Sequence, residues 1–136
     1  MNHTWLKRAS ALIFLLGVVL FGFGVLPGGL ELDLTPGIGI LQIVIFLFGI
    51  TVMTLGASVY MYATRHRVEA PRLREDVGIR FMATGVVVAY VTGLADVLGI
   101  GSNFGVERPV FGLLQMGGVA LGCLIIVIGI AIYSHR

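Results

Sequence analysis

Long runs without any charged residue constrain this chain more than any other feature of its sequence. Four such runs cover residues 9–26, 37–64, 81–95 and 110–134. A helix needs about 20 mainly apolar residues to cross a bilayer, with a range of roughly 17–25. The runs 37–64 and 110–134 exceed this length, and the run 9–26 meets it. The run 81–95 reaches it only when the polar residues at its end are included. We therefore predict four transmembrane helices, over 9–27, 38–63, 79–98 and 110–133.

The composition agrees with a membrane protein of the all-α class. Hydrophobic residues make up 57% of the chain and charged residues only 12%, about half of what a soluble domain carries. The apolar runs have no polar face to meet water, which excludes a soluble helical bundle. They are also continuous, whereas strands of a membrane barrel alternate polar and apolar residues. We expect an integral membrane protein, and we place it in a bacterial cell membrane.

The basic residues predict the orientation of the chain. Lys7 and Arg8 precede the first helix, and Arg136 ends the chain. Five further arginines separate the second and third helices, at positions 65, 67, 72, 74 and 80. Arg108 alone falls on the other side, so the positive-inside rule predicts that both termini are cytoplasmic. The first helix resembles a signal peptide but lacks a small-x-small cleavage site, so we interpret it as a signal anchor.

A short phrase occurs twice in the chain. Pro36 to Gln42 matches Pro109 to Gln115, and the match continues at the same separation to the ends of both helices. The chain holds only two glutamines and four prolines, so these matches carry more weight than those of glycine or leucine. We predict one transmembrane domain, 1–136, made of two repeated helical hairpins. The hairpins are 1–64 and 74–136, joined by a cytoplasmic linker, 65–80.

Each predicted hairpin crosses the membrane twice, so the two copies have the same orientation. They form a parallel repeat, related by a pseudo-twofold axis along the membrane normal. The resemblance is clearest between the second and fourth helices. The first and third helices align poorly at the separation that relates Pro36 to Pro109. Gly17–Val19 against Gly85–Val87 is one weak match, and it needs an insertion.

Most of the repeated residues recur at intervals of seven along each helix. This spacing places them on one face, because seven residues make almost two full turns. On the second helix they are Gly39, Gln42, Gly49, Gly56 and Tyr60; on the fourth they are Gly112, Gln115, Gly122, Gly129 and Tyr133. Small residues let two helix backbones approach closely in lipid. We expect these faces to pack the bundle core or a subunit interface, with the two glutamines at equal depth. The alternative is that they line a narrow path for an ion or small solute.

Two other groups of polar residues carry hypotheses. Asp96 lies in the predicted third helix, where an ionisable group is a functional-site hypothesis by default. Its expected partner is Arg108, in an intramembrane ion pair. His66 and His135 lie at the inner ends of two helices and could ligate haem or a pigment. We favour a structural role, with both histidines at the headgroups.

The sequence contains no constellation typical of an enzyme. It lacks a Ser/His/Asp set, a phosphate loop and a metal cluster, and Cys123 is its single cysteine. We expect no enzymatic activity, no cofactor and no nucleic-acid partner. The leading hypothesis is a structural, assembly or accessory subunit, in contact with lipid and with a homo- or hetero-oligomer. One alternative is an oligomeric channel or transporter using Gln42, Gln115 and Asp96. A second alternative is a cofactor-binding redox subunit.

Overall fold

The chain is helical throughout the parts that its structure describes, residues 3–26, 40–65, 72–95 and 112–135 of a computed structural model. The four helices are α1 (His3–Val25), α2 (Ile40–Thr64), α3 (Leu73–Gly93) and α4 (Leu113–Ser134). Each is long and apolar enough to cross a membrane. The prediction of an all-helical chain with four candidate membrane spans is therefore confirmed.

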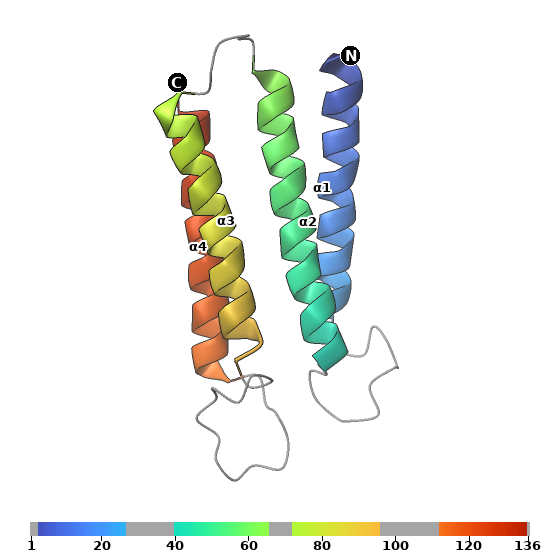
Figure 1. Cartoon of the computed structure of the whole chain (residues 1–136). Coiled ribbons are helices and arrows are strands. Elements are labelled where there is room, and N and C mark those ends of the chain that lie inside the picture. Colours follow the sequence, from blue (N-terminus) through green and yellow to red (C-terminus); the bar gives the residue numbers. More distant parts are fainter. Residues whose placement is uncertain (1–2, 27–39, 66–71, 96–111, 136) are drawn as a thin grey trace.

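The helices are arranged as two antiparallel pairs (Figure 1). Helix α1 packs along α2, and α3 packs along α4. We call α1–α2 the first hairpin and α3–α4 the second hairpin. Among the four described helices, the hairpins meet only through α2, which contacts both α3 and α4. The two ends of the chain lie at the same end of the bundle (Figure 1), which we call the terminal end.

Two helices begin earlier than hydropathy predicts. Helix α1 begins at His3 and α3 at Leu73, six residues before the predicted starts in both cases. In α3 the additional turn contains Arg74, Glu75 and Asp76. The Glu75 carboxylate accepts a hydrogen bond from the backbone N–H of Arg72 at 3.1 Å, which satisfies one of the free donors at the helix start. Acidic residues there also interact favourably with the helix dipole.

Helix α4 begins later than predicted, at Leu113 instead of residue 110. Gly112 is its N-cap and has extended backbone angles, φ −78° and ψ 163°. The backbone N–H of Gly112 donates to Oε1 of Gln115 at 2.9 Å. The side chain of Gln115 therefore fixes where the helix starts, because it pairs with a donor that lies outside the helix.

The buried core lies where α2 meets the second hairpin. Its members come from α2, α3 and α4, and they are Ile43, Leu47, Ile50, Met82, Ala89, Val119 and Ile126. Large apolar side chains also cover the outside of the helices, especially α1, where Leu12, Leu15 and Leu16 are more than half exposed. An apolar exterior is what lipid requires of a spanning helix.

Candidate functional site

Glycines bring the two helices of the first hairpin into backbone contact. A Cβ atom built on Gly49 would lie 2.5 Å from the backbone N of Phe21 and 3.1 Å from the carbonyl O of Gly17. A Cβ atom on Gly17 would lie 3.0 Å from the carbonyl O of Gly49. One on Gly56 would lie 2.7 Å from the backbone N of Phe14. Side chains larger than hydrogen do not fit at these positions without separating α1 from α2.

The second hairpin repeats this arrangement. A Cβ atom on Gly122 would lie 2.7 Å from the carbonyl O of Gly85, and one on Gly85 would lie 2.6 Å from the carbonyl O of Gly122. One on Gly129 would lie 2.8 Å from both the carbonyl O of Gly78 and the backbone N of Met82.

The contacts of the two hairpins correspond under two different separations along the chain. The longer separation is the one that relates Pro36 to Pro109. It applies to α2 and α4, where it relates Gly49 to Gly122 and Gly56 to Gly129. The shorter separation applies to α1 and α3, and the contact residues that it pairs are Gly17 with Gly85, Phe14 with Met82, and Phe21 with Ala89. The match of Gly17 with Gly85, weak in the sequence, thus joins residues with the same packing role. A comparison at the longer separation alone misses it.

Ser10 extends the correspondence to the terminal end of the first hairpin. The shorter separation matches it with Gly78. Its side chain is completely buried, and its hydroxyl donates to the carbonyl O of Lys7 at 2.9 Å. A small, buried residue therefore occupies this matched sequence position in both hairpins. Sequence reasoning did not select Ser10, because an isolated serine in an apolar run carries little signal.

Both glutamines occupy the third position of their helices but make different hydrogen bonds. Gln42 donates from Nε2 to the carbonyl O of Leu26 at 2.9 Å, which connects α2 to the end of α1. Gln115 is buried and accepts from Gly112, within its own helix start. The hydrogen bond of Gln42 thus lies within the first hairpin, and that of Gln115 lies within the second.

The remaining predicted residues fall in different places. Tyr60 is 49% exposed, Tyr133 is half-buried, and His135 lies exposed at the end of α4. Gly39, Asp96, Arg108 and His66 lie outside the described residues, so the structure says nothing of the predicted Asp96–Arg108 pair.

Hydroxyl groups of α2 line its contact with the second hairpin. A hydrogen bond joins Oγ1 of Thr51 and the hydroxyl of Tyr90 at 3.0 Å. About two turns toward the terminal end, the Ser58 hydroxyl lies 3.8 Å from the sulfur of Met82. Thr54, between them, is buried and donates to the carbonyl O of Ile50 at 2.8 Å. The spacing of the three hydroxyl residues is the signal that could have revealed this polar face, because residues three and four apart share a helix side.

An ion pair joins the hairpins at the terminal end of the bundle. Nη2 of Arg65 lies 3.3 Å from Oε2 of Glu75, and both side chains are mostly buried, with 15% and 13% of their surface exposed. Tyr133 of α4 lies within electrostatic reach of both residues. Glu75 thus caps α3 and pairs with the residue that follows α2. The sequence pattern did not predict the pairing of Arg65 with Glu75.

No group of three or more His, Cys, Asp or Glu side chains that could hold a metal ion occurs within the described segments. No protein-family model matches the chain, and neither a curated protein nor a solved structure matches it.

Proposed function

We propose that this chain is an integral membrane protein built from two repeated hairpins in parallel orientation, and that it serves as a structural or accessory subunit of a membrane assembly. The repeat is supported by the equivalent glycine contacts in the two hairpins. It needs a longer connection in the second hairpin, because Gly85 and Gly122 are further apart in the chain than Gly17 and Gly49. A difference in the length of this connection leaves the packing of the two helices of the hairpin unchanged.

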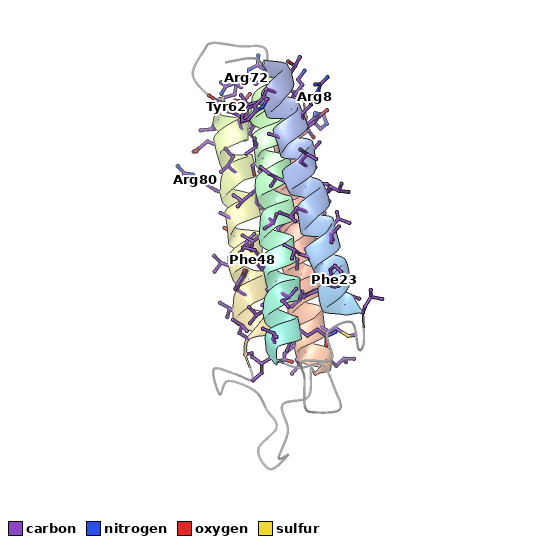
Figure 2. The ribbon with its side chains drawn as sticks, turned by 90° about the vertical axis from the view of Figure 1, so that its right-hand side faces the viewer. Arg8, Phe23, Phe48, Tyr62, Arg72 and Arg80 are labelled. Carbon is purple, nitrogen blue, oxygen red and sulfur yellow. The ribbon has the colours of Figure 1, made fainter. Side chains whose placement is uncertain are left out.

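The orientation of the proposed protein follows from the location of its positive charges. Arg8 of α1 and Arg72, just before α3, lie at the same end of the bundle as Tyr62 (Figure 2). Both chain ends are at this terminal end too (Figure 1). Basic residues favour the cytoplasmic side, and tyrosine and tryptophan favour the membrane interface. Trp5, Tyr60 and Tyr62 are exposed near this end, so we place it in the cytoplasm.

The observation that carries the assembly role is the glycine-mediated contact within each hairpin. Backbone contact holds each pair of helices close together, because a glycine has no side chain to keep the facing helix away. It also leaves the outward faces of α1, α3 and α4 available to other molecules. Helix α1 shows this most clearly, since α2 is its one neighbour among the described helices.

Purification of the tagged chain from its own membranes tests the assembly role. We expect a particle whose protein mass is a multiple of 14.5 kDa, or one that contains a second protein in fixed ratio. Native mass spectrometry from a mild detergent measures this mass. A strictly monomeric protein that retains no other chain would refute the proposal.

An oligomeric channel or small-solute transporter is the second candidate. The row of hydroxyl groups at Thr51, Thr54 and Ser58 favours it, because hydroxyls can replace water around a solute that passes between hairpins. Flux measurements in liposomes test this role. We expect a conducting protein to lose flux in Thr51→Val and Asp96→Ala variants. Liposomes that show no ion or solute leak above protein-free controls would exclude it.

A further inference from the structure

The outward side of α3 combines an acid–base pair with small side chains. We define the α3 outer face by the residues of α3 that lie opposite its contact with α4: Asp76, Arg80, Ala83, Thr84, Val87 and Val91. All except Asp76 are exposed residues, and the side chains of Arg80 and Asp76 are 77% and 49% exposed. Helix α3 is also the least apolar of the four candidate spans.

Arg80 on this face lies within the length of the bundle, whereas Asp76 is in the first turn of α3, at the terminal end. Gly129 packs between Gly78 and Met82, so the turn that contains Arg80 is level with Gly129. Helix α4 continues five residues further, to Ser134, which is about 7.5 Å at 1.5 Å per residue. Figure 2 shows Arg80 directed away from the bundle. Charged side chains inside spans usually face protein or water, not lipid tails.

Within the described part of the chain, Arg80 forms an ion pair only along its own helix. Its Nη2 lies 2.9 Å from Oδ2 of Asp76, one turn earlier. An exposed ion pair of this kind contributes little by itself. The pair is nevertheless self-complementary, because it presents one acid and one base about 6 Å apart along the helix axis. Two copies of this face in parallel can exchange partners, so that each Asp76 meets the Arg80 of the other copy.

We infer that the α3 outer face is the contact between two copies of this chain, related by a twofold axis along the membrane normal. The inference rests on the proposed assembly role and names the partner and the surface. Ala83 and Thr84 let the two α3 helices approach closely, as small residues do in lipid. The Thr84 hydroxyl is already bonded to the carbonyl O of Arg80 at 2.8 Å, so burying it leaves no donor unpaired.

A lipid headgroup is the competing occupant of this face, and the charges argue against it. The Asp76–Arg80 pair is neutral as a unit, which weakens its attraction for an anionic phosphate. The face also continues past the charges into Ala83, Val87 and Val91, one helix turn after another toward the middle of the span. A headgroup covers the charged turn alone, whereas a second α3 covers the whole length.

Charge reversal in two separately tagged chains provides the test. Asp76→Arg gives a face with two positive charges, and Arg80→Asp gives one with two negative charges. We expect each variant alone to self-associate roughly tenfold or more weakly than the native chain, because like charges then oppose each other. Mixed together, the two variants form a heterodimer in which both exchanged pairs are restored. Co-purification through the two tags and native mass spectrometry measure it.

The double variant Asp76→Arg with Arg80→Asp is the matched control. It keeps one acid and one base on the helix, in reversed order, and we expect it to dimerise as the native chain does. If the two single variants fail to pair when mixed, the inference is wrong. If Arg80→Asp instead loses co-purifying phospholipid and mixing restores no dimer, a lipid headgroup occupies the face.

A cross-linking measurement in chains with native charges does not depend on how the charge variants fold. In a Cys123→Ala background, Val87→Cys places a thiol on the α3 outer face, and we expect oxidation to join two chains. Val19→Cys is the control, because Val19 occupies the equivalent place in the first hairpin and is 46% exposed on α1. It should remain uncross-linked. Equal cross-linking at both positions would contradict the inference.

The two proposals fail separately. A dimer that persists in every charge variant, without cross-linking at position 87, would exclude the α3 outer face and leave the assembly role intact. A native chain that is monomeric and retains no partner would exclude both.

Discussion

At the scale of single residues, the helices contain two kinds of glycine. Gly122 has backbone atoms of the facing helix within 2.8 Å of the place where a Cβ atom would stand, whereas Gly117 has no such atom within 4 Å. Both lie in the same apolar helix, five residues apart. The first is required by the approach of α3, and the second faces open space.

The two kinds of glycine should respond oppositely to alanine. We expect Gly122→Ala to lower the free energy of unfolding by about 1–3 kcal/mol, because the new methyl group must push α3 and α4 apart. Gly117→Ala should leave it unchanged or raise it by roughly 0.4–1 kcal/mol, because alanine has fewer unfolded conformations to lose. Denaturant titration in detergent measures both. Equal effects would show that the helices do not pack through Gly122.

The two glutamines should be distinguished by the isosteric change to glutamate. Glutamate retains the acceptor that Gln115 offers to Gly112, and a negative charge at a helix start is favourable. Gln42 acts as a donor toward Leu26, which a carboxylate cannot do. We expect Gln42→Glu to cost about 0.5–1.5 kcal/mol of unfolding free energy, which is the contribution of the lost hydrogen bond. Gln115 is buried, so its matched comparison is Gln115→Met, which lacks the acceptor and should cost more than Gln115→Glu. A Gln42→Glu variant as stable as the native chain would exclude the bond to Leu26.

At the scale of helices, the contact between hairpins differs in character from the contact within them. Within hairpins, backbones touch at glycines. Between hairpins, α2 uses side chains: a Cβ atom built on Gly93 would lie 3.1 Å from Cδ1 of Leu47, and Thr51 bonds Tyr90. Side-chain contacts can rearrange with little movement of the backbone. The position of one hairpin relative to the other is therefore less constrained than the packing of the two helices within each hairpin.

A double-mutant cycle on Thr51→Val and Tyr90→Phe should measure the bond between hairpins. We expect a coupling of about 0.6 kcal/mol, and not more than about 1.7 kcal/mol, as for other hydrogen bonds between helices in membranes. Tyr60→Phe with Thr51→Val serves as the control. Tyr60 is exposed, and the phenol that bonds Thr51 is that of Tyr90, so this cycle should show no coupling. Equal coupling in both cycles would argue against the bond.

Hydropathy predicted the existence of all four helices but not their ends. The uncharged run that begins at Phe81 marks where lipid can surround α3, whereas the helix itself begins at Leu73. Capping by Glu75 decides that start, and capping depends on a hydrogen bond that an apolar count does not contain. In the same way, Pro109 suggested an early start for α4, while the bond between Gly112 and Gln115 sets a later one.

The packing face could be predicted from the sequence for only half of each hairpin. Gly49 and Gly56 stood out because they repeat at one separation in α4. The contacts of Gly49 and Gly56 with α1 did not stand out, because Gly17 matches Gly85 at a different separation along the chain. The Arg65–Glu75 pair joins the end of one helix to the start of the next, and the packing of α2 beside α3 brings the two residues together. No periodicity along one helix contains that information.

At the scale of the whole molecule, both chain ends and most basic residues share one end of the bundle. This end should face the cytoplasm if the positive-inside rule governs insertion. Thr4→Cys and Ser134→Cys, in a Cys123→Ala background, place a thiol at each exposed end. A membrane-impermeant maleimide should label neither in intact cells and both in opened membranes. Labelling of either thiol in intact cells would reverse the proposed orientation.

The glycine contacts within each hairpin also bear on how the chain is made. A ribosome completes α1 and α2 before it begins α3, and the backbone contacts of Gly17, Gly49 and Gly56 involve no later residue. The first hairpin can therefore leave the insertion machinery as a finished pair of helices. The second hairpin then follows as another finished pair, because the backbone contacts of Gly78, Gly85, Gly122 and Gly129 join only α3 and α4. If the chain inserts into a membrane as proposed, its biogenesis requires two insertions of a helix pair and one lateral docking of α2 against α3 and α4.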